Sequence, residues 1–318
     1  KNNKVIKNNE FNCKKISNIV AEIFYIISSA FSSQSLYSLS NFYLNIAKFL
    51  NVNFVSYDTL YAENLNRMNK NNEARSVYNK IKKKGSIYDW HASKQITNIL
   101  IKKKQKKKAI EFLSKNYEKI NNPSAYTTYD FADFLKSSEQ FQRSIFQYNL
   151  VLESIDKNHY LYAGASEGRG VAFERSNQWE KAEIDLLNSL SVSPNQAYVI
   201  NYLAYSWIEK GMNIEKSLKM LEKANKLKKN DGYIIDSLGW ALFKLKKYKK
   251  AKEYLEIAVR IMPADPIVND HFGDSLWMNN KNIQARYYWN YVLNLKKTEA
   301  KLKKDIKRKL IFGIDLKS

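Results

Sequence analysis

The sequence predicts an all-α fold, a right-handed α-solenoid of about eight helical hairpins that ends in a capping helix. Three observations support this class. A pattern of small and aromatic residues returns about every 34 residues. Apolar residues follow the helical period along nearly the whole chain, without convincing strand alternation. Nine glycines and four prolines leave no room for long flexible linkers, so we expect the 318 residues to stack as one array.

The clearest copy of the pattern is residues 231–265, DGYIIDSLGWALFKLKKYKKAKEYLEIAVRIMPAD. With Gly232 as position 1, positions 7, 8, 17, 20, 24, 27 and 32 hold Leu238, Gly239, Tyr248, Ala251, Leu255, Ala258 and Pro263. Small residues at positions 8 and 20 let the two helices of a hairpin cross closely. Pro263 ends the second helix because proline cannot continue the hydrogen-bond ladder. The spacing resembles the tetratricopeptide repeat, a hairpin of helices A and B.

The same positions place each repeat in order along the chain. The predicted repeats are residues 21–54, 55–88, 90–123, 125–158, 163–196, 198–231, 232–265 and 266–299. In five repeats, positions 8, 20 and 24 are all marked. They hold, in chain order, Ser28, Ser40 and Leu44; Ala62, Ala74 and Tyr78; Gly170, Ala182 and Leu186; Gly239, Ala251 and Leu255; and Gly273, Ala285 and Trp289. The third repeat is marked at positions 20 and 24 by Ala109 and Leu113, the fourth at positions 8 and 24 by Ala132 and Tyr148, and the sixth at positions 20 and 24 by Ser217 and Leu221. The sixth repeat departs from the pattern, because Tyr205 replaces the small residue at position 8.

The two ends of the array are expected to be covered by other segments. Residues 1–20 are interpreted as an N-terminal helical remnant or cap. Residues 300–318 are interpreted as a basic capping helix, with an apolar stripe at Leu302, Ile306 and Leu310. One face of that helix would be buried and the other would stay in water, as terminal repeats require.

A candidate binding groove follows from the repeat geometry. Positions 2, 5, 9, 12 and 13 of each helix A should point to the concave face. The candidate groove residues are Tyr202, Tyr233, Asp236, Trp240, Phe243, Asp270, Asp274 and Trp277. Aromatic side chains on rigid helices are frequent hot spots, and a partner would present basic or aromatic groups here. The alternatives are packing between helices for the tryptophans and helix capping for the aspartates.

The formal net charge of +22 suggests a second surface. Two lysine runs, residues 102–108 and 244–250, occupy the same repeat positions at the turn between helices A and B. Equivalent turns line up along one edge of a solenoid, so we expect a basic ridge. Its candidate residues are Lys102, Lys103, Lys104, Lys106, Lys107, Lys108, Lys246, Lys247, Lys249 and Lys250. The alternative is genome composition, because Lys, Asn, Ile and Tyr all have AT-rich codons.

Catalysis, a metal ion and a cofactor are not expected. Cys13 is the single cysteine, so the chain can form neither an intrachain disulfide nor a thiolate cluster. His91, His159 and His271 lie in different repeats, and no arrangement of a nucleophile with a base stands out. His271 lies beside two aspartates, but its repeat position is more typical of a partly buried side chain than of a metal ligand.

No targeting or membrane segment is predicted. The most apolar run, residues 16–31, contains Glu22 and several serines and is expected to be too short to span a bilayer. No signal peptide is visible. The sequence starts at Lys1 and enters directly into helical sequence, which fits a fragment or a processed product. Its location is therefore left open.

Three segments carry a family resemblance: NYLAYSWIEKGMNIEKSLKMLEKA, DGYIIDSLGWALFKLKKYKKAKEYLEIAV and DPIVNDHFGDSLWMNNKNIQARYYWNYVL. Through them residues 17–310 resemble bacterial tetratricopeptide-repeat proteins, especially the C-terminal part of long alphaproteobacterial ones. The resemblance implies a scaffold for partner proteins without enzyme activity. It also favours a periplasmic or envelope setting, because similar proteins tend to carry a secretion signal and further repeats upstream. The lysine-rich composition differs from the usual acidic, alanine-rich members, so a cytoplasmic location stays open.

Three functions are consistent with these observations. The first is a non-enzymatic scaffold that binds a protein or peptide segment in the concave groove. The second is binding of an anionic surface, either nucleic acid or lipid headgroups, by the basic ridge, and this binding would weaken steeply with salt. The third is a helical module of a larger enzyme or assembly. The partner, the process and the oligomeric state are not predicted.

Overall fold

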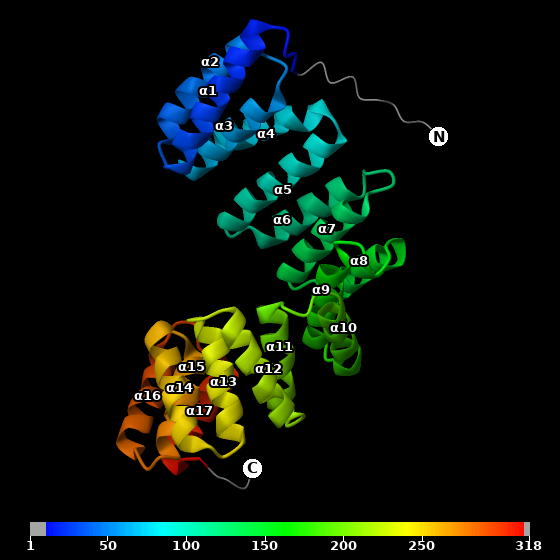
Figure 1. The fold of residues 1–318 in the computed structure, drawn as a ribbon. Coiled ribbons are helices and arrows are strands. Elements are labelled where there is room, and N and C mark those ends of the chain that lie inside the picture. The colour runs from blue at the N-terminus through cyan, green and yellow to red at the C-terminus, as the bar shows by residue number, and fades with distance from the viewer. Residues whose placement is uncertain (1–10, 315–318) are drawn as a thin grey trace. The chain divides into compact units, whose positions relative to one another are not determined.

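The computed structural model describes residues 11–314, and predictions for residues 1–10 and 315–318 lie outside this range. Over the described residues the chain forms seventeen α-helices and one short 3-10 helix, with no strand (Figure 1). The predicted all-α fold class is confirmed.

The chain divides into two compact units, residues 1–140 and 141–318, each described by itself below. Unit 1 holds α1 (Ile16–Ser33), α2 (Tyr37–Leu50), α3 (Val55–Arg67), α4 (Asn71–Ile81), η1 (Lys82–Lys84), α5 (Ser86–Lys102), α6 (Lys106–Tyr117) and α7 (Ala125–Ser137). Unit 2 holds α8 (Phe141–Ser154), α9 (Tyr162–Arg175), α10 (Trp179–Val192), α11 (Ala197–Glu209), α12 (Ile214–Leu227), α13 (Gly232–Lys244), α14 (Tyr248–Ile261), α15 (Pro266–Trp277), α16 (Asn282–Asn294) and α17 (Ala300–Phe312). The sequence predicted a single array, and the division falls inside the predicted repeat 125–158.

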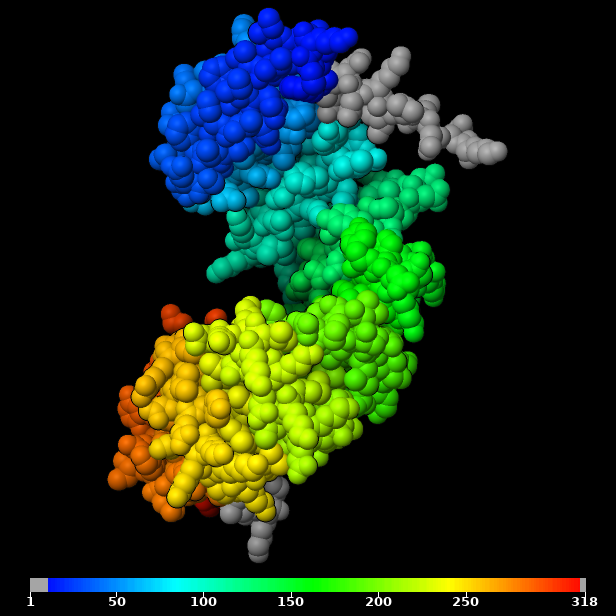
Figure 2. All heavy atoms as spheres, in the orientation of Figure 1, coloured from blue at the N-terminus to red at the C-terminus, as the bar shows by residue number. Residues whose placement is uncertain are grey.

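Successive helices pack as hairpins within each unit. In unit 1 the pairs are α1 with α2, α3 with α4, and α5 with α6. In unit 2 they are α9 with α10, α11 with α12, α13 with α14, and α15 with α16. On the face drawn in Figure 2, the atoms of α11 to α16 form one continuous packed surface. Buried apolar clusters join consecutive hairpins of this unit, as repeat stacking requires.

Each helix A ends in the same hydrogen-bonded turn. After α3, Asn69 adopts a left-handed φ of 62°, and the backbone N–H of Lys70 donates to the carbonyl oxygen of Leu65 at 2.8 Å. This arrangement is a Schellman motif, which satisfies the last free carbonyls of the helix. In the two lysine-rich turns the left-handed residues are Lys104, after α5, and Lys246, after α13. The lysine runs therefore belong to tight hairpin turns.

Small residues lie where the two helices of a hairpin cross. A Cβ added at Gly239 would lie 2.6 Å from Cγ of Leu255, and one added at Gly273 would lie 2.6 Å from the indole ring of Trp289. Side chains at these glycines would push the second helix away. Glycine at position 8 therefore sets the close spacing of α13 with α14 and of α15 with α16.

Helix α11 differs from the predicted register by one residue. It begins at Ala197, and the turn that follows holds one residue more than the turn after α13, with Asn213 in a left-handed conformation. Position 8 is consequently Ala204 and not Tyr205. Ala204 is fully buried in one cluster with Leu221, the residue that a small position 8 should face. The sixth repeat follows the pattern after all.

The C-terminal helix α17 packs on the last hairpin. Ile306 is fully buried in the cluster that contains the side chains of α15 and α16. Leu302 and Leu310 pack against the same cluster. The residues of the predicted apolar stripe thus cover the end of unit 2.

The N-terminal helix α1 is longer than the predicted first helix A. It begins at Ile16, so residues 16–20, assigned from sequence to a separate remnant or cap, belong to the first hairpin. Among the described residues, α1 is the one helix long and apolar enough to cross a membrane by length and composition. From the sequence, this run is expected to be too short. Ser32 of α1 donates to Asn64 of α3 at 2.6 Å, and Ser40 of α2 donates to the carbonyl oxygen of Ser28. The first bond joins α1 to the next hairpin and the second joins the two helices of the first hairpin, so α1 is packed within unit 1.

Candidate functional site

The eight predicted groove residues come from the A helices of three consecutive hairpins in unit 2. Tyr202 lies on α11; Tyr233, Asp236, Trp240 and Phe243 lie on α13; Asp270, Asp274 and Trp277 lie on α15. Helix α13 contacts both α11 and α15. The structure therefore brings these residues onto adjacent helices, but it buries them to very different degrees.

Four of the predicted groove residues are core residues and not open surface. They are Asp236, Trp240, Asp270 and Asp274. Tyr202, Phe243 and Trp277 are partly buried, and only Tyr233 is largely exposed. The acidic and aromatic character seen in the sequence therefore belongs mainly to contacts within the protein.

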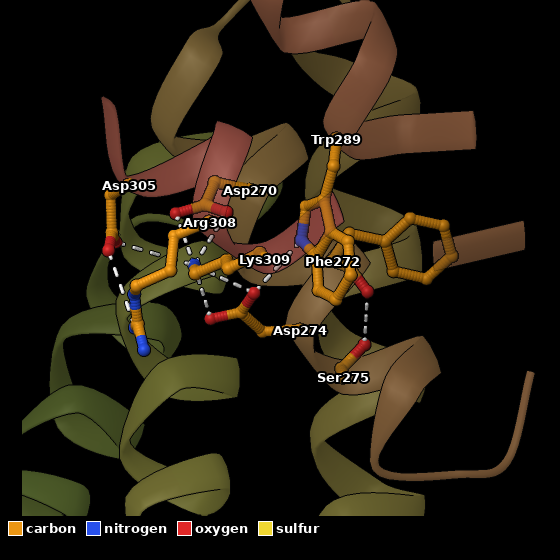
Figure 3. Close-up of polar contacts among 8 residues, drawn as sticks. All are labelled: Asp270, Phe272, Asp274, Ser275, Trp289, Asp305, Arg308 and Lys309. Carbon is orange, nitrogen blue, oxygen red and sulfur yellow. Dashed lines mark hydrogen bonds and ion pairs between the residues drawn. The ribbon is translucent and has the colours of Figure 1, made fainter. Parts of the chain in front are cut away.

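Lys309 of α17 fills the space between two of the predicted groove aspartates. Its Nζ lies 2.8 Å from Oδ1 and 2.9 Å from Oδ2 of Asp270, and 2.8 Å from both carboxylate oxygens of Asp274 (Figure 3). The indole N–H of Trp289 donates to Asp274 at 3.0 Å. Lys309 itself is buried. The capping helix thus supplies the cation that two buried carboxylates need.

The other predicted aspartate pairs with a histidine. Nδ1 of His271 lies 3.1 Å and 3.0 Å from the two carboxylate oxygens of Asp236. The His271 ring stacks on Trp240, with centroids 3.9 Å apart. The indole N–H of Trp240 donates to Glu209 of α11 at 2.7 Å. Through these contacts Trp240 joins three A helices, so its first role is packing.

Burial and charge shift the protonation of this cluster. Burial raises the pKa of Asp274 to about 7; the charge of Asp270 adds to the rise and Lys309 opposes it. Burial alone would lower the pKa of His271, but the neighbouring carboxylates, Asp236 above all, outweigh it and raise that pKa. The pKa of Lys309 is likewise raised, because its two aspartate partners outweigh its burial. Three buried carboxyl groups thus face Lys309 and His271, and Asp305 adds a fourth carboxyl group 4.0 Å from Nζ of Lys309. The crowding of negative charge is relieved when Asp274 binds a proton.

Three residues of this region were not among the predicted groove residues. Lys309 and His271 are central to the buried cluster, and Tyr205 occupies position 9 of α11, its ring 6.4 Å from that of His271. Tyr202 instead lies one position away, where its hydroxyl donates to Glu174 at 2.8 Å. The available signal for Lys309 was the pair of aspartates at positions 5 and 9 of the last helix A, which need a cation from the helix that follows.

An exposed row of two tyrosines and one isoleucine, called the apolar row below, lies at the start of the same three helices. The second residue of each helix is Tyr198 in α11, Tyr233 in α13 and Ile267 in α15, and their side chains are 54%, 60% and 41% exposed. The Tyr198 ring is partly covered, because Nζ of Lys228 lies 3.9 Å from its centroid and its hydroxyl donates to Asp231 at 3.0 Å. Asp231 and Asp265 cap α13 and α15 by accepting backbone N–H bonds, which fixes where these helices begin. The caps therefore place Tyr233 and Ile267 at equivalent points of adjacent helices.

All ten candidate ridge lysines are exposed. Those at residues 102–108 lie in the α5–α6 turn of unit 1 and in the helix ends beside it. Those at residues 246–250 lie in the α13–α14 turn of unit 2 and in the first turn of α14. The second group, with Tyr248, Met278, Asn279 and Asn280, lines an open hollow of about 630 Å³. Each turn by itself offers a dense positive charge, and a continuous ridge stays a prediction. Among residues 11–314, no group of three or more His, Cys, Asp or Glu side chains could hold a metal ion.

Comparisons with known proteins agree with this architecture. The family model described as "Tetratricopeptide repeat" matches residues 53–298, more than half of the chain. A curated relative, the TPR repeat-containing protein PA4667 of Pseudomonas aeruginosa, is 29% identical over 106 residues. That match covers 33% of this chain and 18% of the relative, so the chain spans less than a fifth of the relative's length.

Solved tetratricopeptide structures have a similar fold at low sequence identity. A repeat protein from Parabacteroides merdae is 16% identical with a TM-score of 0.54, over 69% of this chain and 86% of that one. YrrB, a repeat protein described as having an unusual peptide-binding site, is 18% identical with a TM-score of 0.45, over 64% and 97%. MamA of strain AMB-1 is 14% identical with a TM-score of 0.45, over 54% and 99%. At these identities the likeness concerns the fold alone.

Proposed function

The chain belongs to the tetratricopeptide-repeat family, and on this basis we propose that it is a non-enzymatic scaffold for a partner protein or peptide. Stacked helical hairpins present long, rigid surfaces suited to extended partners. The buried carboxylates Asp236, Asp270 and Asp274 are held in internal ion pairs with His271 and Lys309.

The partner segment is proposed to lie along the apolar row of α11, α13 and α15. The observation that carries this proposal is the exposure of Tyr198, Tyr233 and Ile267 at the same position of three adjacent helices. Tyrosines contribute large contact area at small entropic cost, which makes them effective anchors. The buried cluster of Trp240, Asp270 and Asp274 would then be the rigid floor of the site and not its contact surface.

Peptide selection tests this assignment. A displayed library of random peptides is selected on the wild-type chain, and the enriched peptides are then measured against Tyr198→Ser/Tyr233→Ser/Ile267→Ser. Binding should fall at least about tenfold, since anchor residues typically contribute more than 1 kcal/mol each. Tyr287→Ser is the matched control, because Tyr287 is 67% exposed but lies on α16, outside the row. Peptides that bind the triple variant normally and lose affinity for the control would refute the assignment.

Binding of an anionic surface is a second candidate, favoured by the lysine-lined hollow beside the α13–α14 turn. A fluorescent single-stranded oligonucleotide and vesicles with anionic headgroups are the two probes. Either interaction should weaken steeply between low and high salt and disappear in Lys247→Glu/Lys249→Glu/Lys250→Glu. Affinity for both probes that does not change with salt would eliminate this candidate.

A further inference from the structure

Helix α1 carries an apolar stripe that nothing in the described structure covers. Its four isoleucines, Ile16, Ile19, Ile23 and Ile26, follow the spacing of one helix face and are 79%, 43%, 52% and 61% exposed. The opposite face of α1 is already buried, with Ala21 and Ser28 against the rest of unit 1. A helix that is apolar on two faces is typical of the interior of a stack and not of its end.

The inner A helices show what normally covers this stripe. Ile23 occupies position 3 of its repeat. The equivalent residue of α7, Thr127, is partly buried, and the equivalent residue is buried in the other six A helices. These residues are Tyr57, Ala92, Ala165, Val199, Ile234 and Val268. Exposure at this position is therefore a property of α1 and not of the repeat.

The residue type that accompanies the position-3 side chain is also the same from one interface to the next. Ile234 of α13 lies in one buried cluster with Ala224, which is position 27 of the preceding helix B. Val268 of α15 shares a cluster with Ala258. Tyr57 of α3 shares one with Ala47. In all three interfaces a fully buried alanine of the preceding hairpin belongs to the same buried cluster as the position-3 side chain.

We propose that the isoleucine stripe of α1 is the interface for one more tetratricopeptide hairpin, stacked in cis ahead of α1. The hairpin would present an alanine at position 27 to Ile23, with its helix A against the remainder of the stripe. Each interface of this kind within the chain joins hairpins that follow one another in sequence, which favours a preceding repeat over a second copy. The proposal concerns the end of unit 1 and does not depend on the groove of unit 2.

A fusion to the full chain tests the interface. A copy of residues 197–231, the hairpin that contributes Ala224, is joined ahead of Lys1. Hydrogen exchange of the α1 amides should slow by about tenfold or more when the hairpin docks. The matched control is the same fusion with Ala224→Glu in the added copy only, and docking should be lost. Circular dichroism establishes that the added copy is helical in both fusions.

Equal exchange in the two helical fusions would overturn the proposal. So would either of two results with the unfused chain. One is a dimer in light scattering that Ile23→Glu converts to a monomer, which would assign the stripe to a second copy. The other is co-sedimentation with phosphatidylglycerol vesicles that Ile23→Glu abolishes, which would assign it to a membrane surface. A monomeric chain that does not co-sediment, together with slowed exchange in the alanine fusion alone, supports a stacked hairpin.

Discussion

The last hairpin of unit 2 and the first hairpin of unit 1 differ in how their end faces are covered. Each is at the end of a stack, where the face that normally meets a neighbour would be left in water. At the C-terminal end, Ile306 of α17 covers that face and Lys309 forms ion pairs with Asp270 and Asp274. At the N-terminal end, the isoleucines of α1 stay exposed. We call the end covered by α17 the sealed end and the end formed by the exposed isoleucines of α1 the open end. The stability of the sealed end should depend on specific residues, and that of the open end should not.

Removing the buried cation should have the largest effect on the sealed end. Lys309→Met leaves two carboxylates buried without a counter-ion, which typically costs about 3–5 kcal/mol of the free energy of unfolding. The matched control is Arg308→Met, because Arg308 is exposed and makes one 3.4 Å ion pair at the surface. That control should change stability by less than about 0.5 kcal/mol. Equal urea midpoints for the two variants would show that the buried ion pairs do not hold α17.

A smaller loss is expected where α17 ends against Trp277. Gly313 has a left-handed φ of 73°, and a Cβ at this position would collide with the Trp277 ring. Gly313→Ala therefore combines backbone strain with overpacking, and the expected cost is about 1–3 kcal/mol. Urea unfolding measures the loss, and Gly211→Ala is the comparison because it shares the left-handed φ but has open space around it. A larger loss at Gly211 than at Gly313 would contradict packing of the chain end on Trp277.

The sealed end should also respond to pH. An unfolded aspartate titrates near about 3.9, whereas the folded pKa of Asp274 is raised to about 7, so the folded state binds this proton more tightly. The free energy of unfolding should therefore fall as pH rises from about 4 through 7. His271 acts in the same direction, because its pKa is also raised in the folded state. Lys309 stays charged over this window, because its pKa is raised further.

The expected change is on the order of 1–3 kcal/mol between pH 5 and pH 8, measured by urea unfolding. Asp274→Asn removes the titrating group while keeping its shape, so it should flatten the profile. A wild-type chain that is more stable at pH 8 than at pH 5 would mean that Asp274 is ionised throughout. No titratable residue belongs to the isoleucine stripe, so the open end should contribute nothing to this profile.

The fold was predictable because spacing alone determines where helices cross. Gly239, Gly273 and the alanines at position 27 mark close approaches that hold whatever the partner side chains are. The register of α11 was not predictable from the sequence, because the additional residue Asn213 lies in a turn that carries no periodic signal. The site was predictable in composition but not in exposure. A repeat position indicates which way a side chain points, but not whether another segment, here α17 with Lys309, already lies there.

The smallest effect is expected at the open end, and it completes the comparison. Ile23→Ser should alter the free energy of unfolding by less than about 0.5 kcal/mol, because an exposed side chain loses little on substitution. Ile234→Ser at the same repeat position of α13 should cost more than about 2 kcal/mol, because Ile234 is fully buried against Ala224. Urea unfolding of the two variants gives both values. A large loss for Ile23→Ser would mean that the isoleucine stripe is already packed in solution, and the two ends would then be sealed alike.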